Sequence, residues 1–89
     1  MSMKRNTVTQ EQIDALIDGA QIIEYTVHDK CLIVSVKLEN GFIITESSAC
    51  VDPSNYDISI GRAICMERIK NKLWELEGYC LQKQLHEGK

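Results

Sequence analysis

The strongest constraint in this sequence is a change in the spacing of its apolar residues near position 50. Residues 21–49 alternate with a period of two, which is typical of β-strands. After residue 58, apolar residues recur every three or four positions, which is typical of an amphipathic helix. The stretch between them, C-V-D-P-S-N-Y-D, contains the chain's only proline. This order predicts a sheet, a corner and then one long helix.

The 89 residues are enough for one domain, so we interpret residues 1–89 as a single domain whose residues 1–6 form a frayed start. Thr9 and Gln12 fit a capping box that opens a short helix, and Gly19 is suited to end it. The predicted fold class is α+β. It consists of a short N-terminal helix, a three-stranded antiparallel β-meander and a long C-terminal helix packed on the sheet.

Two turns set the register that we expect in the sheet. Asn40-Gly41 is a strong hairpin signal, and Asp29-Lys30 marks an earlier reversal. Treating each as a two-residue loop places one set of side chains on the core face. These are the pairs Val27–Leu32, Tyr25–Val34, Ile23–Val36 and Leu38–Ile43, with Thr45 beside them.

The opposite face of this predicted sheet is too apolar for a surface that only meets water. It would carry Phe42, Ile22, Ile33 and Ile44. We therefore expect a second cover over this face. Packing by the N-terminal helix and contact with another subunit or a ligand are both open at this point.

The long helix is predicted over residues 58–85. Its apolar stripe consists of Ile58, Cys65, Ile69, Leu73, Leu76 and Cys80. Such a helix would be roughly 40 Å long, whereas strands of about eight residues span roughly 25 Å. The excess near Gly78-Tyr79 is expected to bend, to fray or to meet a partner.

Composition disfavours several classes of function. A net charge of −3 leaves no surplus of cations for coating DNA or RNA, so nucleic acid is not an expected partner. No apolar run approaches the roughly 20 residues of a membrane span, and no signal peptide opens the chain, so we expect an intracellular protein.

The four cysteines show no C-x-x-C pair of the kind that announces a zinc site. We interpret Cys31, Cys50, Cys65 and Cys80 as buried small hydrophobic residues in a reducing compartment, with a metal site or a disulfide as the alternative. No metal and no cofactor are expected.

Catalytic constellations are also not evident, so the chain is not expected to be an enzyme. Asp52 and Asp57 could form a carboxylate pair, but capping is the simpler role for both. Asp52 before Pro53 reads as an N-cap followed by the residue favoured at the first helical position. Asn55 or Asp57 can cap the long helix.

Gly61-Arg62 is the part of the corner that capping does not explain. A glycine one turn into a helix costs about 1 kcal/mol relative to alanine, which suggests a close approach by the sheet or by a ligand. Arg62 could bind an anion or pair with Asp52 or Asp57. Arg68 follows six residues later on the same helix.

Several motifs together resemble one family. They are N-G-F at 40–42, V-D-P-S-N-Y-D at 51–57, I-G-R at 60–62 and K-L-W-E-L-E-G-Y at 72–79. This combination, spread over residues 22–81, resembles a family of small tailed-phage and prophage proteins. The resemblance implies a phage origin and action in the host bacterial cytoplasm, without implying an activity.

The layout also resembles, more distantly, the anti-Thoeris phage proteins, which are oligomeric sponges for cyclic ADP-ribose-type immune signals. That resemblance implies a homo-oligomer in which Phe42 stacks on a base and Arg62 and Arg68 contact phosphate. Gly61 joins these candidates because of the close approach that a glycine allows. The leading hypothesis is therefore a non-enzymatic counter-defence sponge for a cyclic nucleotide. The alternative is a module that binds and inhibits a host protein, and a small nuclease or hydrolase ranks last.

Overall fold

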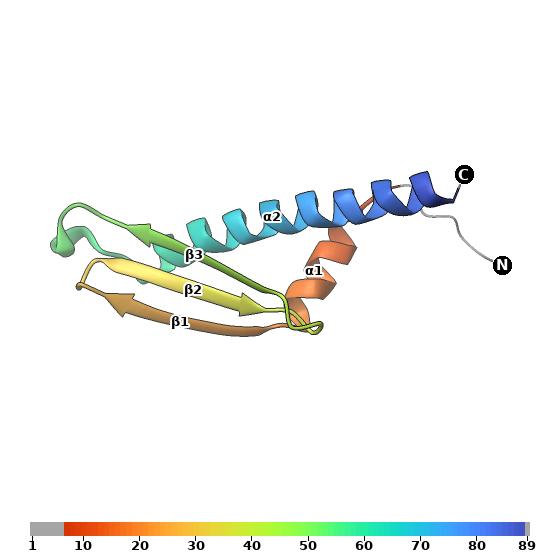
Figure 1. Ribbon diagram of the computed structural model, residues 1–89. Coiled ribbons are helices and arrows are strands. Elements are labelled where there is room, and N and C mark those ends of the chain that lie inside the picture. The colour runs from red at the N-terminus through yellow and green to blue at the C-terminus, as the bar shows by residue number, and fades with distance from the viewer. Residues whose placement is uncertain (1–6, 89) are drawn as a thin grey trace.

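The predicted fold class is confirmed by the computed structural model, which describes residues 7–88. The predicted frayed start at residues 1–6 lies outside the described residues. The elements follow the order α1 (Gln10–Asp18), β1 (Gln21–Val27), β2 (Cys31–Lys37), β3 (Ile43–Ala49), η1 (Pro53–Asn55) and α2 (Ile58–Glu87) (Figure 1). The three strands form one antiparallel sheet in the order β1-β2-β3.

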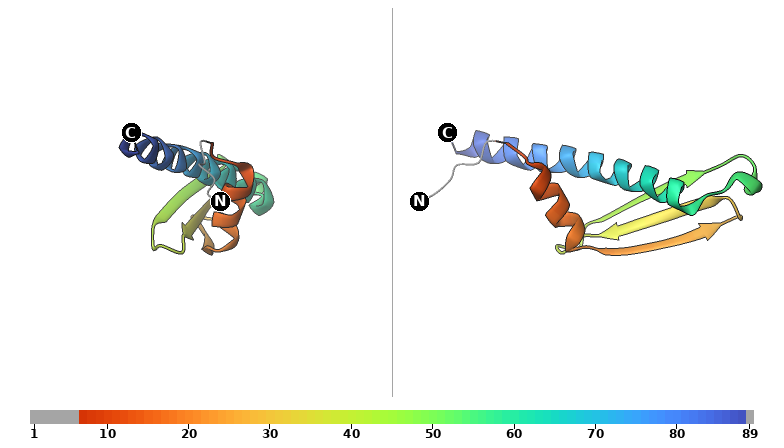
Figure 2. Two further views of the ribbon diagram at one scale, coloured as in Figure 1. Left: turned by 90° about the vertical axis from the view of Figure 1, so that its right-hand side faces the viewer. Right: turned by 180° about the vertical axis from the view of Figure 1, so that it is seen from behind.

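The molecule is elongated, with extents of 55 × 20 × 18 Å. α2 crosses one face of the sheet and continues past the ends of the strands, while α1 lies between the start of β1 and the projecting part of α2 (Figures 1 and 2). Over residues 7–88, no helix has the length and apolar character needed to cross a membrane.

The N-terminal helix begins at the predicted capping box. Thr9 accepts a hydrogen bond from the backbone N–H of Gln12, whose side chain accepts one from the backbone N–H of Thr9. α1 ends at Gly19, as its sequence predicts. This nine-residue helix is too short to persist alone, and the fully buried Ile13 is what anchors it in the core.

The predicted register is wrong by one residue in both hairpins. β1 pairs with β2 through Thr26 and Leu32, and β2 pairs with β3 through Val36 and Ile44. Since side chains alternate along a strand, this shift moves Ile23, Tyr25, Val27, Ile43 and Thr45 away from the core. The residues that replace them on the inner face are Ile22, Glu24, Thr26, Ile44, Glu46 and Ser48.

The reason for the shift lies in the turns, each of which is one residue longer than expected. In the second hairpin, Gly41 donates to Leu38 at 2.8 Å and adopts a φ of 95°, so the glycine follows the turn instead of sitting at its centre. Three-residue loops of this kind end in a left-handed glycine. In the first hairpin, His28 and Asp29 take positive φ values of 56° and 60°.

The core is a single layer between the inner sheet face and α2. Leu32, Val34 and Val36 alternate along β2, and all three are buried. α2 contributes the buried side chains Cys65, Ile69 and Leu73 against them. The predicted stripe is therefore right in its middle and wrong at both ends, since Ile58, Leu76 and Cys80 are exposed.

The projecting part of α2 neither bends nor ends at Gly78. The helix is continuous from Ile58 to Glu87, because its interior hydrogen bonds continue through the glycine. All four cysteines are free, with Cys65 buried, Cys31 and Cys50 half-buried and Cys80 exposed. The prediction that all four are buried is thus wrong for Cys80.

The register can be tested with two adjacent isoleucines. Ile44 is 4% exposed and Ile43 is 57% exposed. Ile44→Ala should lower the free energy of unfolding by about 2–5 kcal/mol because it leaves a cavity in the core. Ile43→Ala should change it by less than about 0.5 kcal/mol. Urea denaturation measures both, and a larger loss for Ile43→Ala would contradict this register.

Candidate functional site

The corner between β3 and α2 is built from two capped turns. Asp52 is the N-cap of η1 and accepts the backbone N–H of Ser54 at 3.0 Å, with Pro53 at the first helical position. Asp57 is the N-cap of α2, so of the two predicted caps, Asn55 and Asp57, the structure selects Asp57. The first amides of α2 are therefore bound by the chain's own carboxylate, which leaves them less available to an anion.

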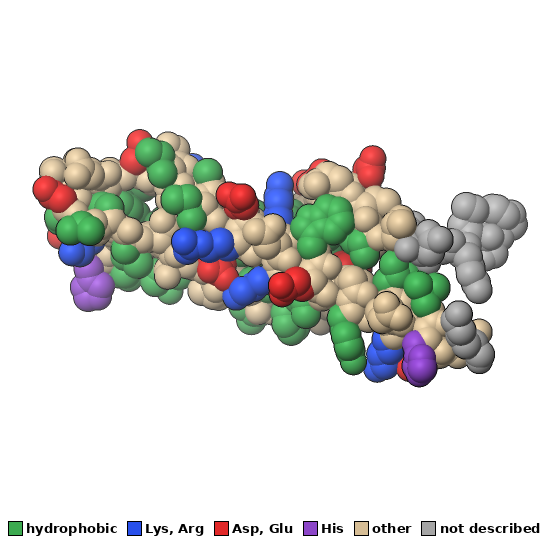
Figure 3. All heavy atoms as spheres, turned by 90° about the horizontal axis from the view of Figure 1, so that it is seen from above, with side chains coloured by type: hydrophobic (Ala, Val, Ile, Leu, Met, Phe, Trp, Pro, Cys, Tyr) green, Lys and Arg blue, Asp and Glu red, His purple; other side chains and the backbone are tan. Residues whose placement is uncertain are grey.

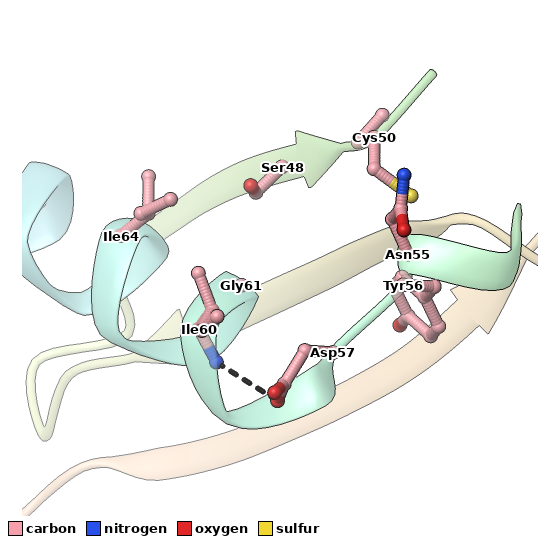
Figure 4. A pocket seen from close by; sticks show the side chains of 9 residues that line it. Ser48, Cys50, Asn55, Tyr56, Asp57, Ile60, Gly61 and Ile64 are labelled. Atoms are coloured by element: carbon pink, nitrogen blue, oxygen red, sulfur yellow. Dashed lines mark hydrogen bonds between the residues drawn. The ribbon is translucent and has the colours of Figure 1, made fainter. Parts of the chain in front are cut away.

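A pocket of about 200 Å³ lies inside this corner. Figure 4 shows Ser48 and Cys50 at the end of β3, Asn55, Tyr56 and Asp57 in the corner, and Ile60, Gly61 and Ile64 on α2. Asp57 also lines this pocket, and its carboxylate accepts hydrogen bonds from the Ser59 and Ile60 amides at the start of α2. We expect it to disfavour a phosphate here, because like charges repel.

Gly61 lines this pocket and also lies against the sheet. A Cβ added at Gly61 would come within 3.4 Å of the Leu32 side chain, so the glycine allows a close approach of α2 to β2. The sequence left open whether the sheet or a ligand approaches Gly61 closely. The structure shows the close approach of the sheet. A ligand role for Gly61 stays a prediction.

Arg62 reaches from α2 to β1. Its Nε donates to both carboxylate oxygens of Glu24, at 3.1 and 2.9 Å, and its Nη2 also bonds Glu24. The hydrogen bond from Arg62 holds the pKa of Glu24 below its ordinary value. Beside it, the Tyr56 and Thr26 hydroxyls bond at 2.7 Å. These contacts tie β1 to the corner and to α2, and the sequence had not predicted Glu24 as the partner.

Arg68 lies on the other side of α2, toward β3. Its guanidinium donates to the backbone oxygen of Ser47 at 2.9 Å, and within residues 7–88 it forms no ion pair. One turn later, Lys72 contacts the carboxylate of Glu46 at 2.6 Å. The side of α2 next to β3 therefore carries two cations, of which only Lys72 is paired with a carboxylate.

Phe42 stands at the end of this same side. Its ring is 50% exposed, and its backbone N–H donates to the Asn40 side chain at 3.0 Å. The Leu38 backbone N–H donates to the Phe42 carbonyl at 2.8 Å, so the N–H and the carbonyl of Phe42 are both hydrogen-bonded. A hollow of about 300 Å³, which we call the hairpin hollow, is lined by Phe42, Ile43, Ile44, Thr45, Lys72, Glu75 and Leu76.

The four residues predicted to bind a ligand are thus not gathered in one place. Phe42 and Arg68 lie on the β3 side of α2, and Arg62 lies on the β1 side. Gly61 lies on the face of α2 that packs against the sheet. Lys72 was not among the predicted ligand residues, although it lies four residues after Arg68 and therefore on the same helix face. Their roles toward any ligand stay predictions.

The face of the molecule seen in Figure 3 shows no field of one sign. Seen from above, Lys, Arg, Asp and Glu side chains lie interspersed along the molecule, with apolar patches between them (Figure 3). This distribution agrees with the net charge of −3 and the lack of a basic stripe in the sequence. Any recognition of an anion must therefore depend on a few local cations.

Comparison with known families decides the origin of the chain. The model of the phage protein (N4 Gp49/phage Sf6 gene 66) family matches residues 8–85. The chain belongs to this family. The match includes α1, the three strands and α2 of this phage protein as far as residue 85. Neither the curated proteins nor the solved structures contain a match to the chain.

The cap at Asp57 generates a prediction about pH. Hydrogen bonds from the Ser59 hydroxyl and from the Ile60 and Ser59 amides hold the pKa of Asp57 below its ordinary value of 3.8. A lowered pKa in the folded state contributes stability that is present above pH 3.8 and lost as pH falls through the folded value. Asp57→Ala should therefore destabilise the protein at neutral pH, by an amount that shrinks below pH 3.8.

Urea denaturation of both proteins across this range measures the difference in the free energy of unfolding. Asp57→Asn is the matched control, because its side-chain oxygen can still accept the amide hydrogen bonds but does not titrate. The difference in the free energy of unfolding between Asp57→Asn and Asp57→Ala should not change with pH. A wild-type advantage that stayed constant down to about pH 2 would contradict the assigned carboxylate role.

Proposed function

We propose that this phage protein is a non-enzymatic binding protein that sequesters a nucleotide on the β3 side of α2. Acting in the host cytoplasm, it would remove a nucleotide signal of the host's immunity. The observation that carries this proposal is the half-exposed Phe42 ring, held beside the hairpin hollow next to Lys72. Sequestration requires binding only, and so needs no acid, base or nucleophile.

Phe42 supplies the contact for a base. Hydrogen bonds at its N–H and its carbonyl fix the hairpin backbone, so little ordering remains to be done when a ligand binds. Stacking of a base on an aromatic ring contributes about 1–3 kcal/mol. Leu76 and Ile43 extend the apolar surface beside the ring.

Lys72 and Arg68 supply the contacts for phosphate. Positions 68 and 76 are separated by about 12 Å along the helix axis, a length that a dinucleotide-sized ligand can span. Arg68 carries a charge that no described carboxylate pairs with. The Lys72 side chain is 53% exposed and that of Glu46 is 15% exposed, so a phosphate would contact Lys72 from its solvent side and leave the bond to Glu46 in place.

Host-protein binding is the second candidate. The same hollow is lined by Phe42, Ile43 and Leu76, and exposed aromatic and aliphatic side chains are common anchors for a protein partner. The two candidates differ in what they need from Phe42. A nucleotide needs the flat face of the ring, whereas a protein pocket can also accept an aliphatic side chain of similar size.

Phe42 variants should separate these candidates. Calorimetric titration with cyclic ADP-ribose, a cyclic dinucleotide and ATP should show binding of at least one of them. Phe42→Leu should weaken that binding by about tenfold or more, while Phe42→Tyr should retain it, because only tyrosine preserves the ring. Absence of binding by all three nucleotides, or equal binding by the leucine variant, would overturn the nucleotide proposal.

Two further variants test the cations. Lys72→Gln should weaken nucleotide binding, whereas Lys70→Gln, which removes a cation that pairs with Asp14 of α1, should not. Arg62→Gln serves as a second control, because Arg62 lies on the β1 side. If only the host-protein candidate holds, nucleotides will produce no heat, and Phe42→Ala will abolish capture of a host protein by the tagged chain.

A further inference from the structure

The outer face of the sheet is a regular surface that no helix in residues 7–88 covers. α2 and α1 both lie on the inner side, so neither covers this face (Figures 1 and 2). Of the strand residues for which the sequence led us to expect a second cover, Ile22 and Ile44 lie on the inner face and Ile33 lies on this one. Four positions of each strand point outward: Gln21, Ile23, Tyr25, Val27, Cys31, Ile33, Ser35, Lys37, Ile43, Thr45, Ser47 and Ala49.

The apolar residues of this face are contiguous. Val27 pairs with Cys31, and Tyr25 pairs with Ile33, so the β1–β2 half of the face forms one block with Ile23 at its end. Ile23 is 63% exposed and Tyr25 is 51% exposed. An antiparallel sheet that faces water on one side carries mostly polar side chains there. This block departs from that pattern, as do surfaces that meet another protein.

The charge of the outer face points to its occupant. Lys37, at one corner, is the only Lys, Arg, Asp or Glu among the outward positions. A nucleic acid or an anionic membrane would need several cations here. A second copy of the chain needs none, because an uncharged face can meet its own copy without like-charge repulsion.

The geometry of the sheet also favours contact through the face over contact through its β3 edge. The Arg68 guanidinium occupies the outward backbone oxygen of Ser47, so another strand cannot pair along β3 without displacing it. Two sheets can instead stack face to face at a spacing of about 10 Å.

The available area sets the strength of this contact. Three strands of seven residues offer a face of roughly 23 × 14 Å, which is about 300 Å² in projection. A standard stable interface buries about 800 Å² on each partner. The sheet face alone is therefore expected to give a reversible dimer whose population depends on protein concentration.

We propose that the outer sheet face is a self-association surface on which a second copy of this chain packs through Ile23, Tyr25 and Ile33. The proposal goes beyond nucleotide binding, because the hairpin hollow shares Ile43 and Thr45 with the outer face but does not include Ile23, Tyr25 or Ile33. The two proposals can therefore fail separately.

Sedimentation velocity of the full chain, from about 1 µM to about 1 mM, tests this surface. The wild type should pass from monomer to dimer over this range. Ile23→Lys should raise the dimer dissociation constant by about tenfold or more, because it places two lysines at a desolvated contact. Its circular dichroism should be unchanged, since residue 23 does not contribute to the core.

Ile60→Lys is the matched control, because Ile60 is 60% exposed but lies on α2, away from the outer face. It should dimerise as the wild type does. A wild type that remained monomeric throughout would overturn the proposal, as would dimerisation of Ile23→Lys equal to that of the wild type. Nucleotide titration of Ile23→Lys then tests the hairpin hollow independently.

Discussion

The burial of three α2 side chains against β2 is the contact on which the rest of the structure depends. Cys65, Ile69 and Leu73 are buried with alternate residues of β2, and this layer is most of the core. Burying each large aliphatic side chain contributes about 1.5–3 kcal/mol. Because β2 is the central strand, its contact with α2 also decides which face of β1 and β3 turns inward.

This single contact layer divides the remaining surface into parts with different chemistry. On the β1 side, the Arg62–Glu24 and Tyr56–Thr26 bonds hold the sheet to the corner. On the β3 side, Arg68, Lys72 and the Phe42 ring line an accessible strip beside the helix. An arginine at residue 62 and one at residue 68 therefore serve different neighbours, although they belong to the same helix.

Much of the architecture could be predicted from the sequence, but the register could not. The capping box at Thr9, the turn signal at Asn40-Gly41 and the acidic caps of the corner are local features, and each one lies where the sequence places it. Which alternate residues of a strand face the core is not decided by neighbouring residues. Ile22-Ile23 and Ile43-Ile44 are apolar doublets that can place an isoleucine on either face, so the pattern tolerates a shift of one residue. Packing of β2 against α2 selects the inner face, and the extra residue in each turn accommodates that choice.

The sequence by itself determined the order and type of the elements and the positions of their caps, because these depend on side chains within a few residues of each other. Its residues 8–85 also match the model of the phage protein family. Only the tertiary structure decided that Arg62 pairs with Glu24, that Phe42 shares a hollow with Lys72, and that the outer sheet face is open. The physical reason is that each of these facts depends on strand register and on the path of α2 across the sheet, which are set by packing between residues far apart in the chain.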